Sequence, residues 1–155
     1  MMGKSLMAVC CLFAALFVHA VEITSDGKPS AEVILPERES RQLTFAAQEL
    51  QLWIKNISGA ELPIYHAPSL RKNTKIFLGR DFLKNQDALD SAGKFDSWII
   101  RSEGRSIYLA ALNDNGVINA VFDLLEKNTD LIFARPDAEY GTVFTPDKNL
   151  DFKIT

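Results

Sequence analysis

The sequence predicts an α+β fold with a mixed, mostly antiparallel β-sheet and two helices packed on one of its faces. Short apolar segments of strand character occur near both ends and in the middle of the chain. Two longer segments between them carry apolar residues at the three- and four-residue spacing of a helix. Because strands and helices follow one another in the order strands, helix, strands, helix, strands, both helices can cover the same side of one sheet.

The first twenty residues have the layout of a secretory signal peptide. Lys4 is their one charged residue, an apolar run extends from Leu6 to Val18, and the small residue Ala20 follows. The run contains 13 residues, whereas a permanent membrane-spanning helix needs about 20. We therefore expect cleavage after Ala20 and a secreted or periplasmic protein that is not attached to a membrane.

Cys10 and Cys11 are the only cysteines of the chain, and both lie in this leader. A lipoprotein is therefore an alternative, although Val9 is bulky for the position before a lipid-bearing cysteine. Cleavage after Ala20 leaves no thiol for a disulfide, a metal site or a nucleophile. Residues 21–155 can form one domain with its own core, and their 16 basic and 20 acidic residues argue against a nucleic-acid partner.

The first half of the remaining chain is predicted to contain four strands and one helix. The strands are expected at Val21–Thr24, Ala31–Leu35, Leu62–Tyr65 and Lys75–Leu78. A turn at 25–29 separates the first two. Ser40 is a favourable N-cap for the helix, and Gly59 stands where the helix should end. Its apolar stripe consists of Leu43, Ala46, Ala47, Leu50, Trp53, Ile54 and Ile57.

The second half is predicted to contain a hairpin, a helix and three closing strands. Trp98–Arg101 and Ser106–Leu112 form the hairpin, and the second of these strands is apolar on both faces, as expected for an interior strand. Either Asn113 or Asp114 can cap the helix, which runs to about Lys127. The closing strands are expected at Leu131–Phe133, Thr142–Phe144 and Leu150–Ile154. The polar stretch 80–92 receives no assignment.

Residues with catalytic chemistry are few. His66 is the single histidine that remains after cleavage, so a multi-histidine metal site is excluded, and its surroundings favour a plain surface residue. Asp123 and Glu126 lie one helical turn apart, followed by Asp130, but their place beside the apolar stripe favours a solvated helix face over a glycosidase carboxylate pair. Asp114 could contact a ligand, although its position at the helix start is explained by capping.

Two tryptophans are candidate platforms for a sugar ring. Trp53 belongs to the apolar stripe of the first helix and is expected in the core. Trp98 can face either side of its strand, so a surface role stays open. Asp114 and Trp98 are therefore the candidate binding residues, and no catalytic residue, metal or cofactor is predicted.

Several segments match a known pattern in the same order along the chain. They are Phe45–Leu50, Ile57–Ile64, Lys75–Gly79, Trp98–Arg101, Ile107–Ala111, Asn113–Glu126, Pro136 and Gly141–Pro146. Together they resemble the N-terminal domain of α-glucuronidases and related bacterial glycosidase-like proteins. The hairpin and second helix are also similar, more loosely, to the second domain of β-N-acetylhexosaminidases.

The resemblance implies a small sheet with two helices on one side and no catalytic residues. In that family the catalytic carboxylates belong to a following (β/α)₈ barrel, which needs about 250 residues, so we expect this chain to be truncated before its barrel. Two positions depart from the pattern: Ile132 stands where an arginine is usual, and Asn119 stands where an aromatic residue is common. A ligand role for the region around Ile132 and Asn119 is therefore not expected.

The function implied is that of a non-catalytic accessory domain of an exported glycoside hydrolase involved in polysaccharide degradation. Its partner would be the catalytic barrel of the parent protein, and a glycan is a second candidate partner. The alternative is a free-standing secreted domain that binds carbohydrate or has a structural, interaction role. For the carbohydrate-binding alternative, the candidate aromatic residues are Trp98, Tyr65 and Tyr140.

Overall fold

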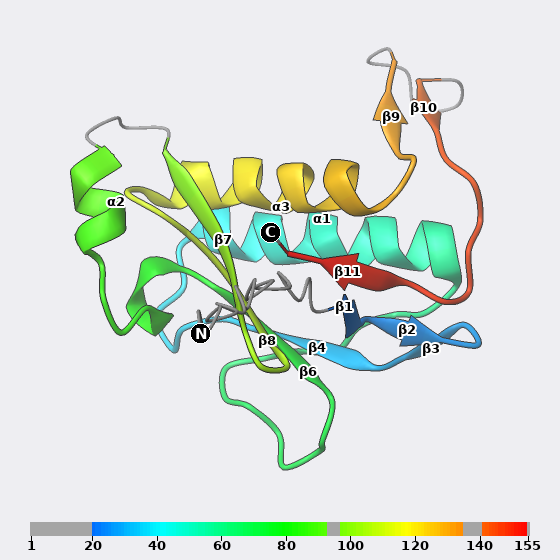
Figure 1. Ribbon diagram of the computed structural model, residues 1–155, viewed down its shortest axis with the longest axis horizontal. Coiled ribbons are helices and arrows are strands. Elements are labelled where there is room, and N and C mark those ends of the chain that lie inside the picture. Colours follow the sequence, from blue (N-terminus) through cyan, green and yellow to red (C-terminus); the bar gives the residue numbers. More distant parts are fainter. Residues whose placement is uncertain (1–19, 93–96, 135–140, 155) are drawn as a thin grey trace, which may run out of the picture.

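The computed structural model describes residues 20–92, 97–134 and 141–154. A five-stranded sheet forms its centre (Figure 1). Its strands, in spatial order, are β5 (Ile64–Tyr65), β4 (Ala31–Ile34), β6 (Thr74–Leu78), β8 (Ser106–Ala111) and β7 (Trp98–Glu103). β4 pairs in parallel with β5 and β6, and β6 pairs in parallel with β8, whereas β7 and β8 form an antiparallel hairpin.

Three separate two-stranded antiparallel pairs complete the strands of the described residues. They are β1 (Ala20–Glu22) with β11 (Asp151–Lys153), β2 (Thr24–Ser25) with β3 (Lys28–Pro29), and β9 (Ile132–Phe133) with β10 (Thr142–Val143). The predicted α+β class with mixed strand pairing is confirmed. The antiparallel pairings lie in the small sheets and in the β7–β8 hairpin. The remaining pairings of the five-stranded sheet are parallel. Parallel neighbours need a crossover connection, and α1 lies in the one between β4 and β5.

The first helix, α1 (Arg41–Ser58), begins and ends where the sequence predicts. The Ser40 hydroxyl accepts a hydrogen bond from the Leu43 amide at 3.2 Å. Gly59 follows the helix in the left-handed conformation, with φ of 81°, and its N–H donates to the Lys55 carbonyl. These two residues stabilise the free amide and carbonyl groups at the helix ends.

The second long helix, α3 (Asp114–Asn128), is capped by Asn113, whose side-chain oxygen accepts from the Gly116 amide at 3.0 Å. Of the two caps that the sequence allows, the structure selects Asn113, and Asp114 lies in the first turn. α1 and α3 pack against each other and lie on the same side of the five-stranded sheet (Figure 1). The predicted placement of both helices on one face is confirmed.

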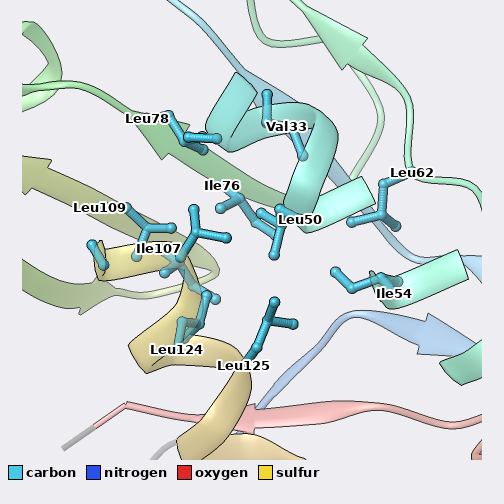
Figure 2. Packing of buried hydrophobic residues seen from close by; sticks show 14 of the residues in the cluster. Val33, Leu50, Ile54, Leu62, Ile76, Leu78, Ile107, Leu109, Leu124 and Leu125 are labelled. Atoms are coloured by element: carbon cyan, nitrogen blue, oxygen red, sulfur yellow. The ribbon is translucent and has the colours of Figure 1, made fainter. Parts of the chain in front are cut away.

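The core lies between this sheet and the two helices. Figure 2 shows inward side chains of the strands meeting side chains of both helices. The labelled members are Val33, Ile76, Leu78, Ile107 and Leu109 on the strands, Leu50, Ile54, Leu124 and Leu125 on the helices, and Leu62 in the segment between α1 and β5. All are buried. Burial of each such side chain contributes about 1.5–3 kcal/mol, and this burial selects the face on which the helices lie.

β8 occupies the interior position that its two apolar faces predict, between β6 and β7. Ile107 and Leu109 face the helices, whereas Tyr108 and Ala110 face the opposite side of the sheet. Ala110 is fully buried and Tyr108 half-buried, so the second face of the strand is also covered.

The stretch without a sequence assignment contains two short helices, the 3₁₀-helix η1 (Arg80–Phe82) and α2 (Asp87–Ala92). Arg80 holds the turn between them, since its guanidinium donates to the Gln86 side chain, which in turn donates to the Arg80 carbonyl. Among the residues described, no helix combines the length and apolar character needed to cross a membrane.

Candidate functional site

The two long helices carry a second apolar stripe on the side that does not contact the sheet. Its members, here called the outer helix surface, are Phe45, Leu52 and Trp53 of α1, Ile118 and Phe122 of α3, and Phe133 of β9. Phe45 and Leu52 are 46% and 45% exposed. Phe45 and Ile118 line a shallow hollow between the N-terminal halves of the two helices. A solvent-facing helix side is normally polar, so this stripe is a candidate interaction surface.

Aromatic rings form one end of the outer helix surface. Phe133 packs edge-on against Trp53 of α1, with ring centroids 5.1 Å apart, and against Phe122 of α3 at 5.3 Å. The Trp53 indole also donates a hydrogen bond to Glu49 and contacts Phe144. Trp53 is half-buried, so the expectation of a core residue needs correction: its ring packs on the edge of the core and also forms part of the surface.

The β9–β10 ribbon extends this surface. Figure 1 shows it projecting past the end of α3, away from the sheet. Ile132 and Val143 pair across the ribbon and are each 59% exposed. The Asp130 carboxylate anchors the base of the ribbon by accepting hydrogen bonds from the hydroxyl and amide of Thr145, which lower the pKa of Asp130. Ile132, which stands where the resembled pattern usually has an arginine, thus adds exposed apolar area to the ribbon that extends the outer helix surface.

Trp98, one of the two candidate binding residues, is 40% exposed on the edge strand β7. Its indole donates to the Asp123 carboxylate at 3.1 Å, and Lys127 donates to the same oxygen at 2.8 Å. Asp123 was expected on a solvated face, but its side chain is only 23% exposed and accepts the hydrogen bond from Trp98. Glu126 is exposed. The Asp123 carboxylate thus binds a tryptophan and a lysine, and among the described residues no hydrogen bond joins it to Glu126.

The other candidate residues are separate from Trp98. Asp114 is half-buried in the first turn of α3, and among the described residues no hydrogen bond joins it to Trp98. His66 is exposed, with Nε2 3.0 Å from a Glu39 carboxylate oxygen. A backbone hydrogen bond at Glu39 and the contact with His66 lower the pKa of Glu39. Tyr65 is exposed on the edge strand β5. Tyr140 lies outside the described residues.

A buried carboxylate, Glu32 of β4, was missed by the sequence analysis. It is fully buried and accepts hydrogen bonds from the amide and hydroxyl of Ser69, at 2.8 and 2.7 Å, and from the Asn73 amide group at 3.1 Å. Burial by itself would raise the pKa of Glu32, but the hydrogen bonds from Lys75, Ser69 and Asn73 outweigh it and lower the pKa to about 2. The sequence feature that could have revealed this buried carboxylate is a glutamate inside an otherwise apolar strand segment, Ala31–Leu35.

The chain is similar to known proteins in structure only, and the similarity covers a small part of each of those proteins. No family model matches the sequence, and no curated protein is similar to it. One similar solved structure is a GH138 enzyme targeting pectin rhamnogalacturonan II, with a TM-score of 0.45 and 16% identity over 74% of this chain and 11% of that chain. Another is the GH20 β-N-acetylhexosaminidase from Streptomyces coelicolor A3(2), with a TM-score of 0.47 and 13% identity over 87% and 25%. The chain thus spans about a tenth and a quarter of these glycoside hydrolases.

Proposed function

We propose that this chain is a non-catalytic accessory domain of an exported glycoside-hydrolase-like protein, of the α-glucuronidase type, and that it packs against the catalytic barrel of that protein. The ordered resemblance of residues 45–146 to the N-terminal domain of α-glucuronidases supports the family. The observation that carries the accessory role is the outer helix surface, where Phe45 and Leu52 are nearly half exposed on a helix side that is normally polar. An apolar surface of this kind is typical of an interface.

The barrel is the proposed occupant of the outer helix surface. The five-stranded sheet covers the opposite side of both helices, so the outer side is the one left for a second domain. The exposed ribbon residues Ile132 and Val143 would widen the contact. The domain would then support the barrel, which in the family that it resembles carries the catalytic carboxylates.

The test compares the purified chain with a variant in which Phe45 and Leu52 are both replaced by glutamine. The wild-type chain should bind an apolar dye or self-associate by light scattering, and the double variant should do so much less. Leu70→Gln is the matched control, because Leu70 is fully exposed on the loop between β5 and β6, away from both helices. A wild-type monomer that binds no dye contradicts the proposed surface, and glycosidase activity of the purified chain contradicts the accessory role.

Export is a separate part of the proposal. Cleavage after Ala20 would place Val21 at the new N-terminus, and Val21 would still pair with Phe152 of β11. Production of the full-length chain in a bacterial host should therefore give a periplasmic or secreted protein whose N-terminal sequence begins at Val21. An uncleaved chain in the cytoplasm contradicts this part alone.

A further inference from the structure

A cavity of about 270 Å³ lies on the side of the sheet opposite the outer helix surface. One wall comes from the segment that follows η1, residues 82–85, and the other from Arg101, Glu103 and Tyr108 of the β7–β8 hairpin. Arg101 and Tyr108 are direct neighbours across the hairpin. This volume is slightly below the roughly 300 Å³ at which typical small-molecule sites begin, so the cavity suits a ligand no larger than a single ring with its substituents.

Aromatic rings form the apolar part of the cavity. Tyr108 and Phe82 both line it, and both pack against Phe77 of β6. The Phe77 and Tyr108 rings are stacked, with centroids 5.0 Å apart and planes 10° apart, and the centroid of the Phe82 ring also lies 5.0 Å from that of Phe77. Phe77 therefore fixes the two cavity rings in place, and the ligand meets a preformed aromatic wall.

The polar groups of the cavity are mainly donors. Within the part of the chain that the structure describes, neither the Arg101 guanidinium nor the Tyr108 hydroxyl has a hydrogen-bond or ion-pair partner. The Asn85 oxygen accepts from the Asp87 amide, which leaves the N–H₂ group of Asn85 as a further donor. At the rim, Lys84 and Glu103 lie 3.4 Å apart and offset each other in charge. Arg101 is an exposed residue of the cavity lining, and it has no counter-charge there, so it gives the cavity a net positive charge that an anion can reach from solvent.

The loop that forms one wall is held by its own hydrogen bonds. Arg80 and Gln86, which flank residues 82–85, exchange three hydrogen bonds of 2.5, 3.1 and 3.2 Å. Arg80 also donates to the Leu112 carbonyl at the end of the hairpin, which ties the two walls together. A site whose walls are fixed before binding loses less conformational entropy when a ligand enters.

We propose that this cavity binds a small sugar acid, with its carboxylate on Arg101 and its ring against Tyr108 and Phe82. A planar guanidinium without a partner matches a carboxylate through two parallel hydrogen bonds. The Tyr108 hydroxyl and the Asn85 amide would donate to ring hydroxyls or to the ring oxygen. The site lies on the far side of the sheet from the outer helix surface, so it does not depend on the proposed accessory role.

The test is an NMR titration of the isotope-labelled purified chain with three compounds: glucuronate, glucose and acetate. Glucose lacks the charge and acetate lacks the ring. Glucuronate should shift the amide signals of Arg101 and Tyr108 saturably, with a dissociation constant on the order of 1 mM, as expected for a ligand of this size. Glucose and acetate should each bind at least about tenfold more weakly, because each loses one of the two contacts.

Two variants and one control locate the site. Arg101→Gln should weaken glucuronate binding at least about tenfold, and Tyr108→Phe should weaken it less, because the ring remains. Arg105→Gln removes the same charge from the exposed turn of the same hairpin, outside the cavity, and should leave binding unchanged. The proposal is overturned if glucuronate does not saturate, if acetate binds equally well, or if Arg105→Gln weakens binding as much as Arg101→Gln.

Discussion

The ammonium group of Lys75 lies 2.7 Å from a carboxylate oxygen of Glu32, and the two residues are direct neighbours on β6 and β4. Glu32 is fully buried, and the Lys75 side chain is only 14% exposed. Ser69 and Asn73, which also bind Glu32, belong to the loop between β5 and β6. The ion pair thus joins two neighbouring strands, and the hydrogen bonds from Ser69 and Asn73 tie the loop to the same carboxylate.

Replacement of Lys75 by methionine should destabilise the fold by about 3 kcal/mol, the usual cost of leaving one partner of a buried ion pair without its counter-charge. Glu32 would keep only the neutral donors from Ser69 and Asn73. Urea denaturation followed by circular dichroism measures the change in the free energy of unfolding. Lys72→Met removes the same charge from an exposed position in the same loop and should cost less than about 0.5 kcal/mol. Equal losses in both variants would refute a specific role of the pair.

Stability should also fall in acid through Glu32. Its pKa is about 2 in the folded protein and near 4.5 without these contacts, so the stabilisation is complete above about pH 4.5 and is lost as the pH falls toward about 2. At 1.36 kcal/mol per pKa unit, this loss amounts to roughly 3 kcal/mol. Glu32→Gln should be less stable than wild type at neutral pH, with a flatter profile over this range. Urea denaturation at a series of pH values measures this dependence. If the free energies of unfolding of wild type and variant fall in parallel with pH, Glu32 does not cause the loss of stability in acid.

The helices could be predicted from sequence because local chemistry determines them. Ser40 and Gly59 set the two ends of α1 through contacts within a few residues, and the apolar spacing selects the inward face. The order and direction of strands were harder to predict, because β4 and β6 pair residues as far apart in sequence as Ala31 and Thr74. Such pairing depends on where the intervening helix returns the chain.

The candidate surfaces were predicted less well than the fold. Phe45 and Leu52 were visible in the sequence as apolar residues outside the inward stripe of α1, but only packing shows that Phe133 and Ile118 extend that stripe. The cavity joins Tyr108 with a segment, 82–85, that has no periodic pattern. Its shape depends on the contacts of Arg80 and Gln86, which sequence spacing does not reveal.

Gly116→Ala should destabilise the protein, although alanine favours a helix over glycine by about 1 kcal/mol. A Cβ added at Gly116 would lie 2.5 Å from the Cβ of Ala111 in β8, and neither atom can move without shifting backbone. The expected cost is about 1–3 kcal/mol in urea denaturation.

The double variant Gly116→Ala with Ala111→Gly removes the clashing atom and should recover part of the loss. Asn119→Ala, at an exposed position of the same helix, should cost little. If Gly116→Ala proves as stable as wild type, the close contact between α3 and β8 is wrong.

The capping of α3 gives a test that separates Asn113 from the candidate binding residue Asp114. Asn113→Ala removes the oxygen that accepts from the Gly116 amide and should cost about 1 kcal/mol, whereas Asn113→Asp keeps an accepting oxygen and should cost little. Asp114→Asn removes only a charge near the helix start, so a loss of about 0.3–1 kcal/mol is expected. Urea denaturation of the three variants ranks the residues. A larger loss for Asp114→Asn than for Asn113→Ala would assign the cap to Asp114 and contradict the observed geometry.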